Sequence, residues 1–490
     1  MMTRLKHQKP WLLIAALFVA FPTCIAGEET KPVLQARCAL PFQDNAVLQQ
    51  KIPLPVWGTS LPGAKVSVTF DGQTKSTAAD KDGKWRIVLE PMVAVKLASV
   101  NEAPEGKDMT VACELGGEKA VTKITNLVVG DVWICAGQSN MAGTMRTNTS
   151  RHFPEDSLAK ANYPGLRFMV SPEEEPWLVC SPETATEIKK VAFFFGRRVQ
   201  QDALVPIGLI AAAVGGSNIE SWLNQAPYGK GKNYKTLMEP IVGFGIRGAI
   251  WYQGESNEKD GRDYLPKLKS LILGWRKAWD QPDSKAADGP HRDFSVYFVQ
   301  LPGISESPAD NPAGGDGRAE IRNAQFEALA LPNTGMSVAI DVGAKSEHPP
   351  NKYDTGERLA RWALNKDYGF KDLVPSGPLY KGFKVEGNTI RISFEHAGGG
   401  LMLAEKEGFL PAKETPDAKL GWLSIQAKDG TWHWAESKID GADLIVSSPD
   451  VKEPVAVRYA YTQHPTGSLL YNREALPASP FSTCGFDPKP

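Results

Sequence analysis

The chain has 490 residues, which is too long for one ordinary domain and predicts roughly three to four. Its apolar content of 42% is typical of globular proteins and is enough for several hydrophobic cores. The formal net charge of −1 gives no electrostatic reason to expect binding to nucleic acid or to an acidic membrane surface.

Residues 1–26 have the pattern of a secretory signal peptide. A basic start precedes the apolar run 11–21, and small residues at Cys24 and Ala26 predict cleavage after Ala26. The run is well short of the ~20 apolar residues that a transmembrane helix requires. Lipidation of Cys24 is the weaker alternative, because the preceding Phe-Pro-Thr is a poor match to the sequence that precedes a lipidated cysteine. We therefore expect a secreted or periplasmic protein with no membrane span.

Five cysteines remain after the signal peptide, and an odd number leaves at least one thiol unpaired within the chain. They are Cys38, Cys113, Cys135, Cys180 and Cys484. Cys135 lies in an apolar run and is the one expected to be free and inert, whereas export permits disulfides among the others. No spacing resembles a zinc or iron–sulfur site, so we expect neither a metal nor a cofactor.

Residues 33–125 predict an N-terminal β-sandwich domain. Short strands are separated by Pro-Gly and Asp-Gly turns, which is the pattern typical of a sandwich. The expected strands are 46–50, 54–58, 65–70, 75–80 and 84–91. A structural role beside the next domain is favoured over a separate binding site.

Residues 126–370 change to apolar strands that alternate with amphipathic helices. The expected strands are 127–137, 206–216, 247–257, 294–301 and 336–343, and the expected helices are 186–202, 264–280, 318–331 and 352–364. Strands that are apolar throughout need cover on both faces, which predicts an α/β domain with a parallel sheet and flanking helices. Ligands of such sheets bind outside the carboxyl ends of the strands.

Residues 371–487 return to strands and predict a C-terminal β-rich domain. The expected strands are 383–396, 422–437, 443–449 and 456–462. Within the α/β region, the Pro-, Gly- and Asp-rich segment 304–320 is either a solvated loop or a wall of a pocket near the strand ends.

Ser139 is the candidate nucleophile of the α/β region. It lies in "CAGQSNM", where an apolar strand ends in polar residues, although Met141 takes the place of the second glycine of a nucleophile elbow. The alternative is an ordinary helix cap. His348 is the candidate base, because it is the one histidine that follows the last strand of the expected sheet, and a neutral imidazole can accept the serine proton.

Acyl transfer also needs donors for the developing oxyanion, each worth roughly 2.7–4 kcal/mol. The candidates are the backbone N–H groups of Ser139 and Gly216 and the side-chain amide of Gln253, all at expected strand ends. The glycine pair in "VGGSN" lets the main chain approach a substrate, but it also fits a plain turn. Gln253 also fits a buried structural amide. Glu255 is expected to hold Gln253 or the nucleophile loop.

Four ordered blocks resemble the motifs of the sialate O-acetylesterase family in the SGNH hydrolase superfamily. The blocks are "GDVWICAGQSNM", "AAVGGSNIESW", "RGAIWYQGESN" and "EHPPNKYDTGERLARWAL". Segments near both ends of the mature chain resemble the same family, so the likeness covers nearly all of it. The resemblance implies a flavodoxin-like α/β core, no metal, and removal of O-acetyl groups from sugars. It assigns the nucleophile to Ser139, the base to His348, and the oxyanion hole to Gly216, Gln253 and the Ser139 amide.

One position departs from the family's pattern, because Lys345 stands where SGNH enzymes usually carry an aspartate three residues before the histidine. Three groups can orient the imidazole instead: the Glu347 carboxylate, the Asp341 carboxylate, or the backbone carbonyl of Ser346. A weak or inactive enzyme is a further alternative.

The sequence therefore predicts an exported serine esterase whose partner is an O-acetylated carbohydrate. The first alternative keeps the chemistry and takes acetylxylan or another plant or algal polysaccharide as substrate. A sialate enzyme is expected to offer an arginine to the sugar carboxylate, and Arg318 and Arg322 are the candidates. The second alternative is a noncatalytic carbohydrate-binding protein with a decayed site.

Overall fold

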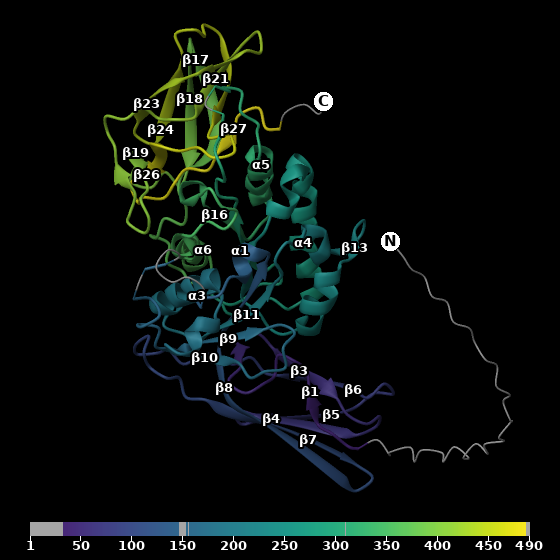
Figure 1. Ribbon diagram of the computed structural model, residues 1–490. Helices are drawn as coiled ribbons and strands as arrows, with labels where there is room; N and C mark the ends of the chain where they lie inside the picture. The colour runs from purple at the N-terminus through teal and green to yellow at the C-terminus, as the bar shows by residue number, and fades with distance from the viewer. Residues whose placement is uncertain (1–32, 147–152, 155, 309, 487–490) are drawn as a thin grey trace, which may run out of the picture. The chain divides into compact units, whose positions relative to one another are not determined.

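The computed structural model describes residues 33–146, 153–154, 156–308 and 310–486 (Figure 1). The predicted signal peptide, residues 1–26, lies outside the described residues. Among the helices of the described part, none is long and apolar enough to cross a membrane.

A central mixed sheet forms the middle of the molecule. Its strands are β8 (Glu118–Gly137), β9 (Tyr163–Val170), β10 (Leu178–Cys180), β11 (Ile207–Ala213), β14 (Gly248–Tyr252), β15 (Ser295–Gln300) and β16 (Thr334–Val338). The strand order is β10-β9-β11-β8-β14-β15-β16. Every pairing from β9 to β16 is parallel, but β10 pairs antiparallel with β9. The prediction of a parallel sheet is therefore corrected at this edge, where β10 follows β9 through a short connection.

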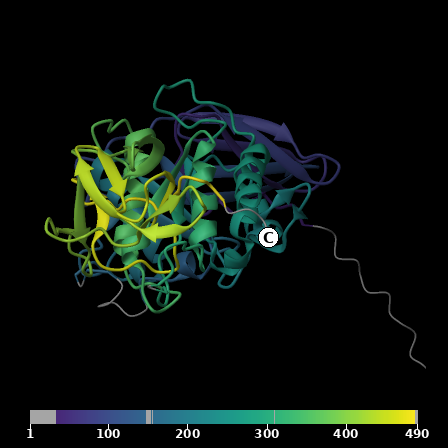
Figure 2. The same ribbon diagram turned by 90° about the horizontal axis from the view of Figure 1, so that it is seen from above.

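Helices cover both faces of the sheet, as strands that are apolar throughout require (Figures 1 and 2). The helices are α1 (Ser139–Ala142), α3 (Lys190–Ala203), α4 (Tyr264–Trp279), α5 (Ala319–Glu327) and α6 (Lys352–Lys366). Trp133 of β8 packs edge-on against Phe195 of α3, with ring centroids 5.0 Å apart. Trp251 of the neighbouring strand β14 packs in the same way against Trp275 of α4, at 5.7 Å.

Short helices and a small two-stranded ribbon connect these elements. They are η1 (Thr184–Glu187), η2 (Ile219–Trp222), η3 (Tyr234–Met238), η4 (Glu239–Ile241), η5 (Glu255–Asp263), η6 (Ala328–Ala330), η7 (Ile340–Val342), β12 (Asn224–Gln225) and β13 (Gly229–Lys230). Two of them, η5 and η7, directly follow sheet strands and so begin at the carboxyl edge of the sheet.

β8 joins the N-terminal β-rich region to the central sheet. That region contains β1 (Arg37–Cys38), β2 (Val47–Gln49), β3 (Leu54–Thr59), β4 (Lys65–Phe70), β5 (Gln73–Ala78), β6 (Lys84–Leu89) and β7 (Lys107–Leu115). The first half of β8 pairs antiparallel with β7 and is largely exposed, whereas its second half is buried between β11 and β14. One hydrophobic core therefore runs through both regions.

Part of the C-terminal β-rich region has a core of its own. Its strands are β17 (Leu379–Glu386), β18 (Thr389–Glu395), β19 (Leu401–Glu405), β20 (Lys413–Glu414), β21 (Leu423–Ala427), β22 (Trp432–Trp434), β23 (Glu436–Asp440), β24 (Asp443–Ser447), β25 (Pro454–Tyr459), β26 (Leu469–Asn472) and β27 (Phe481–Ser482). Alternate side chains of β18 and β24, such as Ile392 and Leu444, join those of β21 and β25 in a separate buried cluster. The period of two along these strands produces this face. Residues of β17, β19 and β26 instead join the core of the other two regions.

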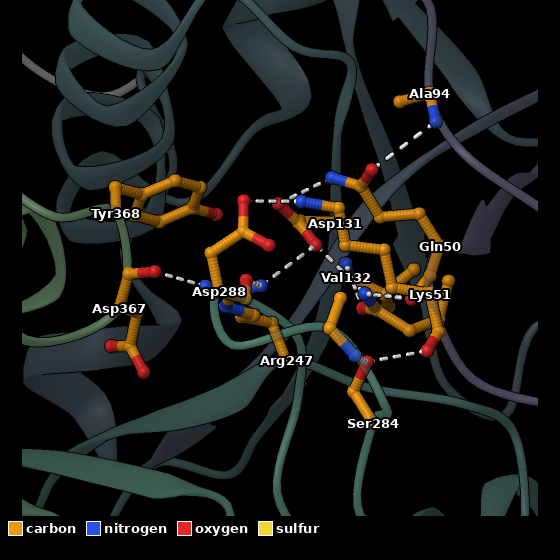
Figure 3. A network of polar contacts seen from close by, with 12 residues as sticks. Gln50, Lys51, Ala94, Asp131, Val132, Arg247, Ser284, Asp288, Asp367 and Tyr368 are labelled. Carbon is orange, nitrogen blue, oxygen red and sulfur yellow. Dashed lines mark hydrogen bonds and ion pairs between the residues drawn. The ribbon is translucent and has the colours of Figure 1, made fainter.

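A buried polar network lies where β8 enters the parallel part of the sheet (Figure 3). The Asp131 carboxylate accepts hydrogen bonds from Gln49 at 2.7 Å and Gln50 at 3.1 Å, and it lies 3.7 Å from the Arg247 guanidinium. Arg247 also donates to the carbonyls of Asp288 and Asp367 and lies over the Tyr368 ring. This network, which we call the Asp131 network, fixes β8 against β2 and β14.

The five cysteines of the described residues are all free. Cys135 is fully buried in β8, and burial raises the pKa of its thiol. Burial likewise raises the pKa of the Cys38 and Cys180 thiols to about 12, so these groups are protonated and unreactive at neutral pH.

Candidate active site

Three adjacent parallel strands end at the same level of the sheet. In the strand register, Gly137 at the end of β8 lies beside Ala213 of β11 and Tyr252 of β14. Each of these residues is followed at once by one of the polar or glycine-rich turns that the sequence singles out. The common register therefore brings the turns after β8, β11 and β14 together, as predicted for the carboxyl edge of a parallel sheet.

Gly137 allows the chain to leave the sheet at this point. Its φ is +143°, and a Cβ atom built on it would lie 2.1 Å from the Tyr252 carbonyl oxygen. The carbonyl of Gly137 accepts a hydrogen bond from Val214, and the N–H of Gln138 donates to Tyr252. The turn into α1 is thereby held to both neighbouring strands, and only glycine fits its first position.

Ser139 is the first residue of α1 and is half-buried, beside the glycine pair that follows β11. A Cβ atom built on Gly215 would lie 3.8 Å from the Cβ of Ser139, and one on Gly216 would meet nothing within 4 Å. Gly216 has a φ of +69°, which favours glycine. Neither the Ser139 N–H nor the Gly216 N–H donates a hydrogen bond within the described residues. Two backbone donors are thus available next to the serine.

The Gln253 amide, which the sequence predicts either as an oxyanion donor or as a buried structural amide, contacts the turns around it. Its side chain is fully buried, and its Nε2 lies within hydrogen-bond distance of Gln138 Oε1 at 3.1 Å, Asn257 Oδ1 at 2.7 Å and the Ser217 carbonyl at 3.2 Å. Its Oε1 accepts from the Tyr264 hydroxyl at 2.8 Å. These contacts hold the turns after β8, β11 and β14 together, and the role of Gln253 as an oxyanion donor stays a prediction.

Asn140, the residue after Ser139, is the centre of a second buried polar network. Its Nδ2 donates to Glu255 Oε1 at 2.5 Å and to the Glu347 carbonyl at 3.0 Å. Its Oδ1 accepts from Lys352 Nζ at 2.5 Å. We call Asn140, Glu255 and Lys352 the Asn140 cluster. Glu255 therefore holds the nucleophile loop, which is one of the two roles that the sequence predicts for it.

Burial shifts the titration of both charged groups in the Asn140 cluster toward neutral pH. It raises the pKa of Glu255, although hydrogen bonds and the nearby Arg318 and Lys352 act in the opposite direction. It lowers the pKa of Lys352 to about 7, against the opposing charge of Glu255. Oε2 of Glu255 accepts no hydrogen bond among the described residues.

His348 lies in an exposed loop that Asn140 joins to the nucleophile turn. The hydrogen bond from Asn140 to Glu347 connects the direct sequence neighbours of Ser139 and His348. The backbone N–H of His348 donates to Ser346 Oγ at 3.1 Å. No hydrogen bond joins the serine hydroxyl to the imidazole within the described residues. Catalytic hydrogen bonds are often long without substrate and shorten when it binds.

Asp341, one of the three groups predicted to orient His348, is bonded to other side chains. Its carboxylate receives two hydrogen bonds from Arg358, at 2.6 and 2.7 Å, and a third from the Tyr471 hydroxyl at 3.2 Å. The side chain is 1% exposed. Three hydrogen bonds therefore hold this carboxylate against α6 and the C-terminal region. The Glu347 side chain and Lys345 are exposed, and Lys345 forms an ion pair with Glu306 at 3.1 Å.

The two arginines that could bind a sugar carboxylate are also buried in the structure. Arg322 is fully buried and donates to the carbonyls of Leu301, Pro302, Thr462 and Gln463. Arg318 is fully buried as well, and its Nε donates to Glu258 at 2.9 Å. Both side chains join the 301–318 segment to its surroundings, and of the two guanidinium groups only the Arg318 Nη2 lacks a hydrogen-bond partner among the described residues.

Sequence reasoning missed Asn140 and Lys352 as parts of the site. Asn140 stands next to the serine in "GQSNM", and Lys352 ends "HPPNK" four residues after the histidine. The short distance in sequence between Lys352 and His348 is the one indication that Lys352 belongs to the site. Only the fold shows that the side chains of Lys352 and Asn140 are in contact. Among the described residues, no group of three or more His, Cys, Asp or Glu side chains could hold a metal ion.

Comparisons with known proteins give a consistent result. A family model described as "Carbohydrate esterase, sialic acid-specific acetylesterase" matches residues 129–349. Sialate O-acetylesterase from Homo sapiens is 27% identical over 507 aligned residues, which cover 90% of this chain and 91% of the relative. The same enzyme from Mus musculus is 26% identical, with 90% and 93% covered. The crystal structure of a carbohydrate acetylesterase from Xanthomonas citri is 30% identical, covers 91% of this chain and 99% of that one, and has a TM-score of 0.76.

Proposed function

The chain belongs to the carbohydrate esterase family of sialic acid-specific acetylesterases, and from this premise we propose that Ser139 is its nucleophile. The protein is a carboxylic ester hydrolase that removes acetyl groups from carbohydrate. The observation that carries the assignment is the common register of β11, β8 and β14, which places Ser139 beside the Gly215–Gly216 turn. Apart from the edge strands β9 and β10, the order is β11-β8-β14-β15-β16, in which β8 lies between the two strands that follow it; this order supports an SGNH-like, flavodoxin-like core.

The reaction begins when the Ser139 hydroxyl attacks the acetyl carbonyl carbon while His348 accepts the hydroxyl proton. The N–H groups of Ser139 and Gly216 donate to the oxyanion of the tetrahedral intermediate, where each donor is worth roughly 2.7–4 kcal/mol. The intermediate collapses with loss of the sugar alcohol, which takes the proton from His348. Water then hydrolyses the acetyl-enzyme by the same proton path and releases acetate.

His348 acts without a buried aspartate beside it. Asp341 is paired with Arg358, and Lys345 occupies the position where the aspartate usually stands. A backbone carbonyl can orient an imidazole by accepting its Nδ1 proton, and the Ser346 carbonyl is next to the loop histidine. The Glu347 carboxylate is the other group available in this loop. We propose a Ser139–His348 pair whose orientation depends on the loop more than on a third charged residue.

A neutral acetylated polysaccharide is the second candidate for the substrate, beside O-acetylated sialic acid. The buried arginines favour it, because Arg322 is bonded to protein carbonyls and Arg318 is buried and paired with Glu258. A sugar without a carboxylate needs no arginine partner.

The test is acetate release by the purified protein and by Ser139→Ala from 4-nitrophenyl acetate, O-acetylated sialic acid and acetylated xylan. We expect release by the wild type and none above background by Ser139→Ala. The preferred natural substrate then decides between sialate and neutral glycan. A folded wild type that releases no acetate from any substrate would instead support the noncatalytic carbohydrate-binding protein.

We also propose that the protein is exported after cleavage near Ala26 and that residues 33–125, 126–370 and 371–487 are its three domains. The separate core within the C-terminal strands supports the last boundary. The N-terminal residue of protein recovered from the exported fraction tests the cleavage. Limited proteolysis tests the boundaries, because linkers between domains are cleaved first.

A further inference from the structure

The Asn140 cluster has an arrangement that a purely structural ion pair would not need. Lys352 and Glu255 are both buried and oppositely charged, yet no direct ion pair joins them within the described residues. The Asn140 amide bridges them, with a hydrogen bond of 2.5 Å on each side. Burying two charges is costly unless they are paired and hydrogen-bonded. Among the described residues, Glu255 and Lys352 contact each other only through Asn140, and one Glu255 oxygen has no hydrogen-bond partner. The folded protein is therefore less stable than it would be with a direct ion pair.

Lys352 is also unfavourably placed by its own helix. It is the first residue of α6, and Asn351 caps this end by accepting a hydrogen bond from the Asp354 N–H. The helix N-terminus carries a partial positive charge, which disfavours a lysine there. The groups that face the ammonium are Asn140 of α1, Glu255 of η5, the Tyr252 ring 5.4 Å away and the Lys190 cation of α3.

The polarity of the contacts determines which way the Asn140 amide points. Its nitrogen faces two acceptors, Glu255 Oε1 and the Glu347 carbonyl, and its oxygen faces the Lys352 donor. Without that donor, the oxygen loses its only hydrogen-bond partner among the described residues, and only the two bonds from the nitrogen hold the amide. The bond to Glu347, which joins the serine turn to the histidine loop, then loses one of the three contacts that fix its geometry.

We propose that Lys352 is a positioning residue that holds Asn140 in the orientation that joins the Ser139 turn to the His348 loop. This inference rests on the proposed function, because it assumes that Ser139 and His348 react together. A displacement of about 1 Å between two reacting groups can cost about 10²-fold in rate, so the effect of Lys352 falls on kcat and not on substrate binding.

The test compares the wild type with Lys352→Met, which keeps the length of the side chain and removes its donor. We expect kcat for 4-nitrophenyl acetate to fall about 10- to 100-fold with KM within about threefold. The rate at which an organophosphonate labels Ser139 falls by a similar factor. The matched control is Lys406→Met, since Lys406 is also buried and pairs with Asp354 of α6 at 2.7 Å without contacting Asn140. Its kcat is expected to stay at the wild-type level.

Thermal unfolding separates positioning from a structural role. The pKa of Lys352 is about 7 in the folded protein and about 10.4 when unfolded, so the folded state disfavours the charged amine. This cost is present in full below pH 7 and is relieved as the pH rises toward 10. Lys352→Met removes the cost, so its Tm at pH 6 is expected to equal or exceed that of the wild type although its kcat is lower. Lys406→Met is expected to lower Tm.

The outcomes distinguish the two proposals. A Lys352→Met enzyme with wild-type kcat and labelling rate would overturn the positioning role while leaving the serine mechanism intact. So would a loss of activity that only follows a lowered Tm. If Ser139→Ala keeps its activity, the proposed function fails and the role of Lys352 fails with it.

Discussion

The two ends of the buried half of β8 carry two polar networks of different character. At Asp131 the carboxylate contacts two glutamine amides and a guanidinium, and the arginine is bonded further to two backbone carbonyls (Figure 3). Gly137, where the chain turns toward Asn140, is only six positions after Asp131. There the Glu255 carboxylate has one oxygen with no partner among the described residues.

The difference shows how one strand serves both stability and chemistry. In the Asp131 network both carboxylate oxygens accept a hydrogen bond, and the orphaned atom is the Arg247 Nε, which has no partner among the described residues. The network lies at the amino end of the parallel strands, opposite the edge where ligands bind. The Asn140 cluster lies at the carboxyl end, and the charges of Glu255 and Lys352 are disfavoured by burial. Removing a charge is therefore expected to destabilise the protein at one end and to stabilise it at the other. Natural enzymes often show such a trade-off at their active sites.

Ser139→Ala should have the largest effect, and it should lower activity without lowering stability. We expect kcat/KM for 4-nitrophenyl acetate to fall by at least about 10³-fold, because the nucleophile is lost. The Tm should stay within about 1 °C, since the half-buried hydroxyl makes no hydrogen bond to the described residues. Steady-state kinetics and thermal unfolding of the same sample measure both. A large fall in Tm would show that the serine is structural.

Arg247→Met should have the opposite effect. Removing one partner of a buried pair leaves the Asp131 charge uncompensated and typically costs about 3–5 kcal/mol. We expect the midpoint of urea unfolding to fall clearly while kcat/KM of the folded protein is unchanged. The control is Lys123→Met, whose pair with Asp108 is exposed to solvent and contributes little to stability. Equal midpoints for the two variants would contradict a stabilising role for the Asp131 network.

Glu255→Gln should stabilise the protein in a pH-dependent way. The pKa of Glu255 is raised by burial, so the wild type becomes less stable as the pH rises from about 4.3 through the folded pKa. Arg318, Lys352 and Asn140 face the carboxyl group and limit this cost. The variant should match the wild-type Tm near pH 4 and exceed it at pH 7, by about 1 kcal/mol in unfolding free energy.

Unfolding curves between pH 4 and pH 8 test this prediction. A gap between the two proteins that does not change with pH would show that titration of Glu255 does not contribute. The oxygen of the glutamine can still accept from Asn140, so the loss in kcat should be smaller than that of Lys352→Met. A larger loss would place the carboxylate itself in the reaction.

The sequence predicts the local elements of this site well. The helix expected at 264–280 is α4 (Tyr264–Trp279), and the one expected at 352–364 is α6 (Lys352–Lys366). Both have a clear helical period, and their ends carry recognisable signals such as the Asn351 cap. The strand ends that meet at Ser139 were also predictable, because each apolar run stops at glycine or polar residues.

Contacts between distant segments were not predictable in the same way. Nothing near Asp341 in the sequence indicates Arg358 as its partner, and Gln253 looks the same whether its amide faces a ligand or Asn257. β9 was missed because the apolar residues of Tyr163–Val170 are interrupted by Pro164 and Gly165. Such features depend on the packing of residues that only the fold brings together.

Lys345→Asp should have the smallest effect. It tests whether a carboxylate at position 345 orients the His348 imidazole. The residue is 88% exposed and pairs with Glu306, so a carboxylate there is screened by water and stabilises the imidazolium by about 0.5 kcal/mol. We expect kcat to rise about twofold, and by less for Lys345→Ala, which removes the cation without adding an acid. A rise above tenfold would mean that the new carboxylate reaches the ring and completes a triad. The natural enzyme would then be limited by its missing acid, and the Asn140 cluster would be only part of what positions the histidine.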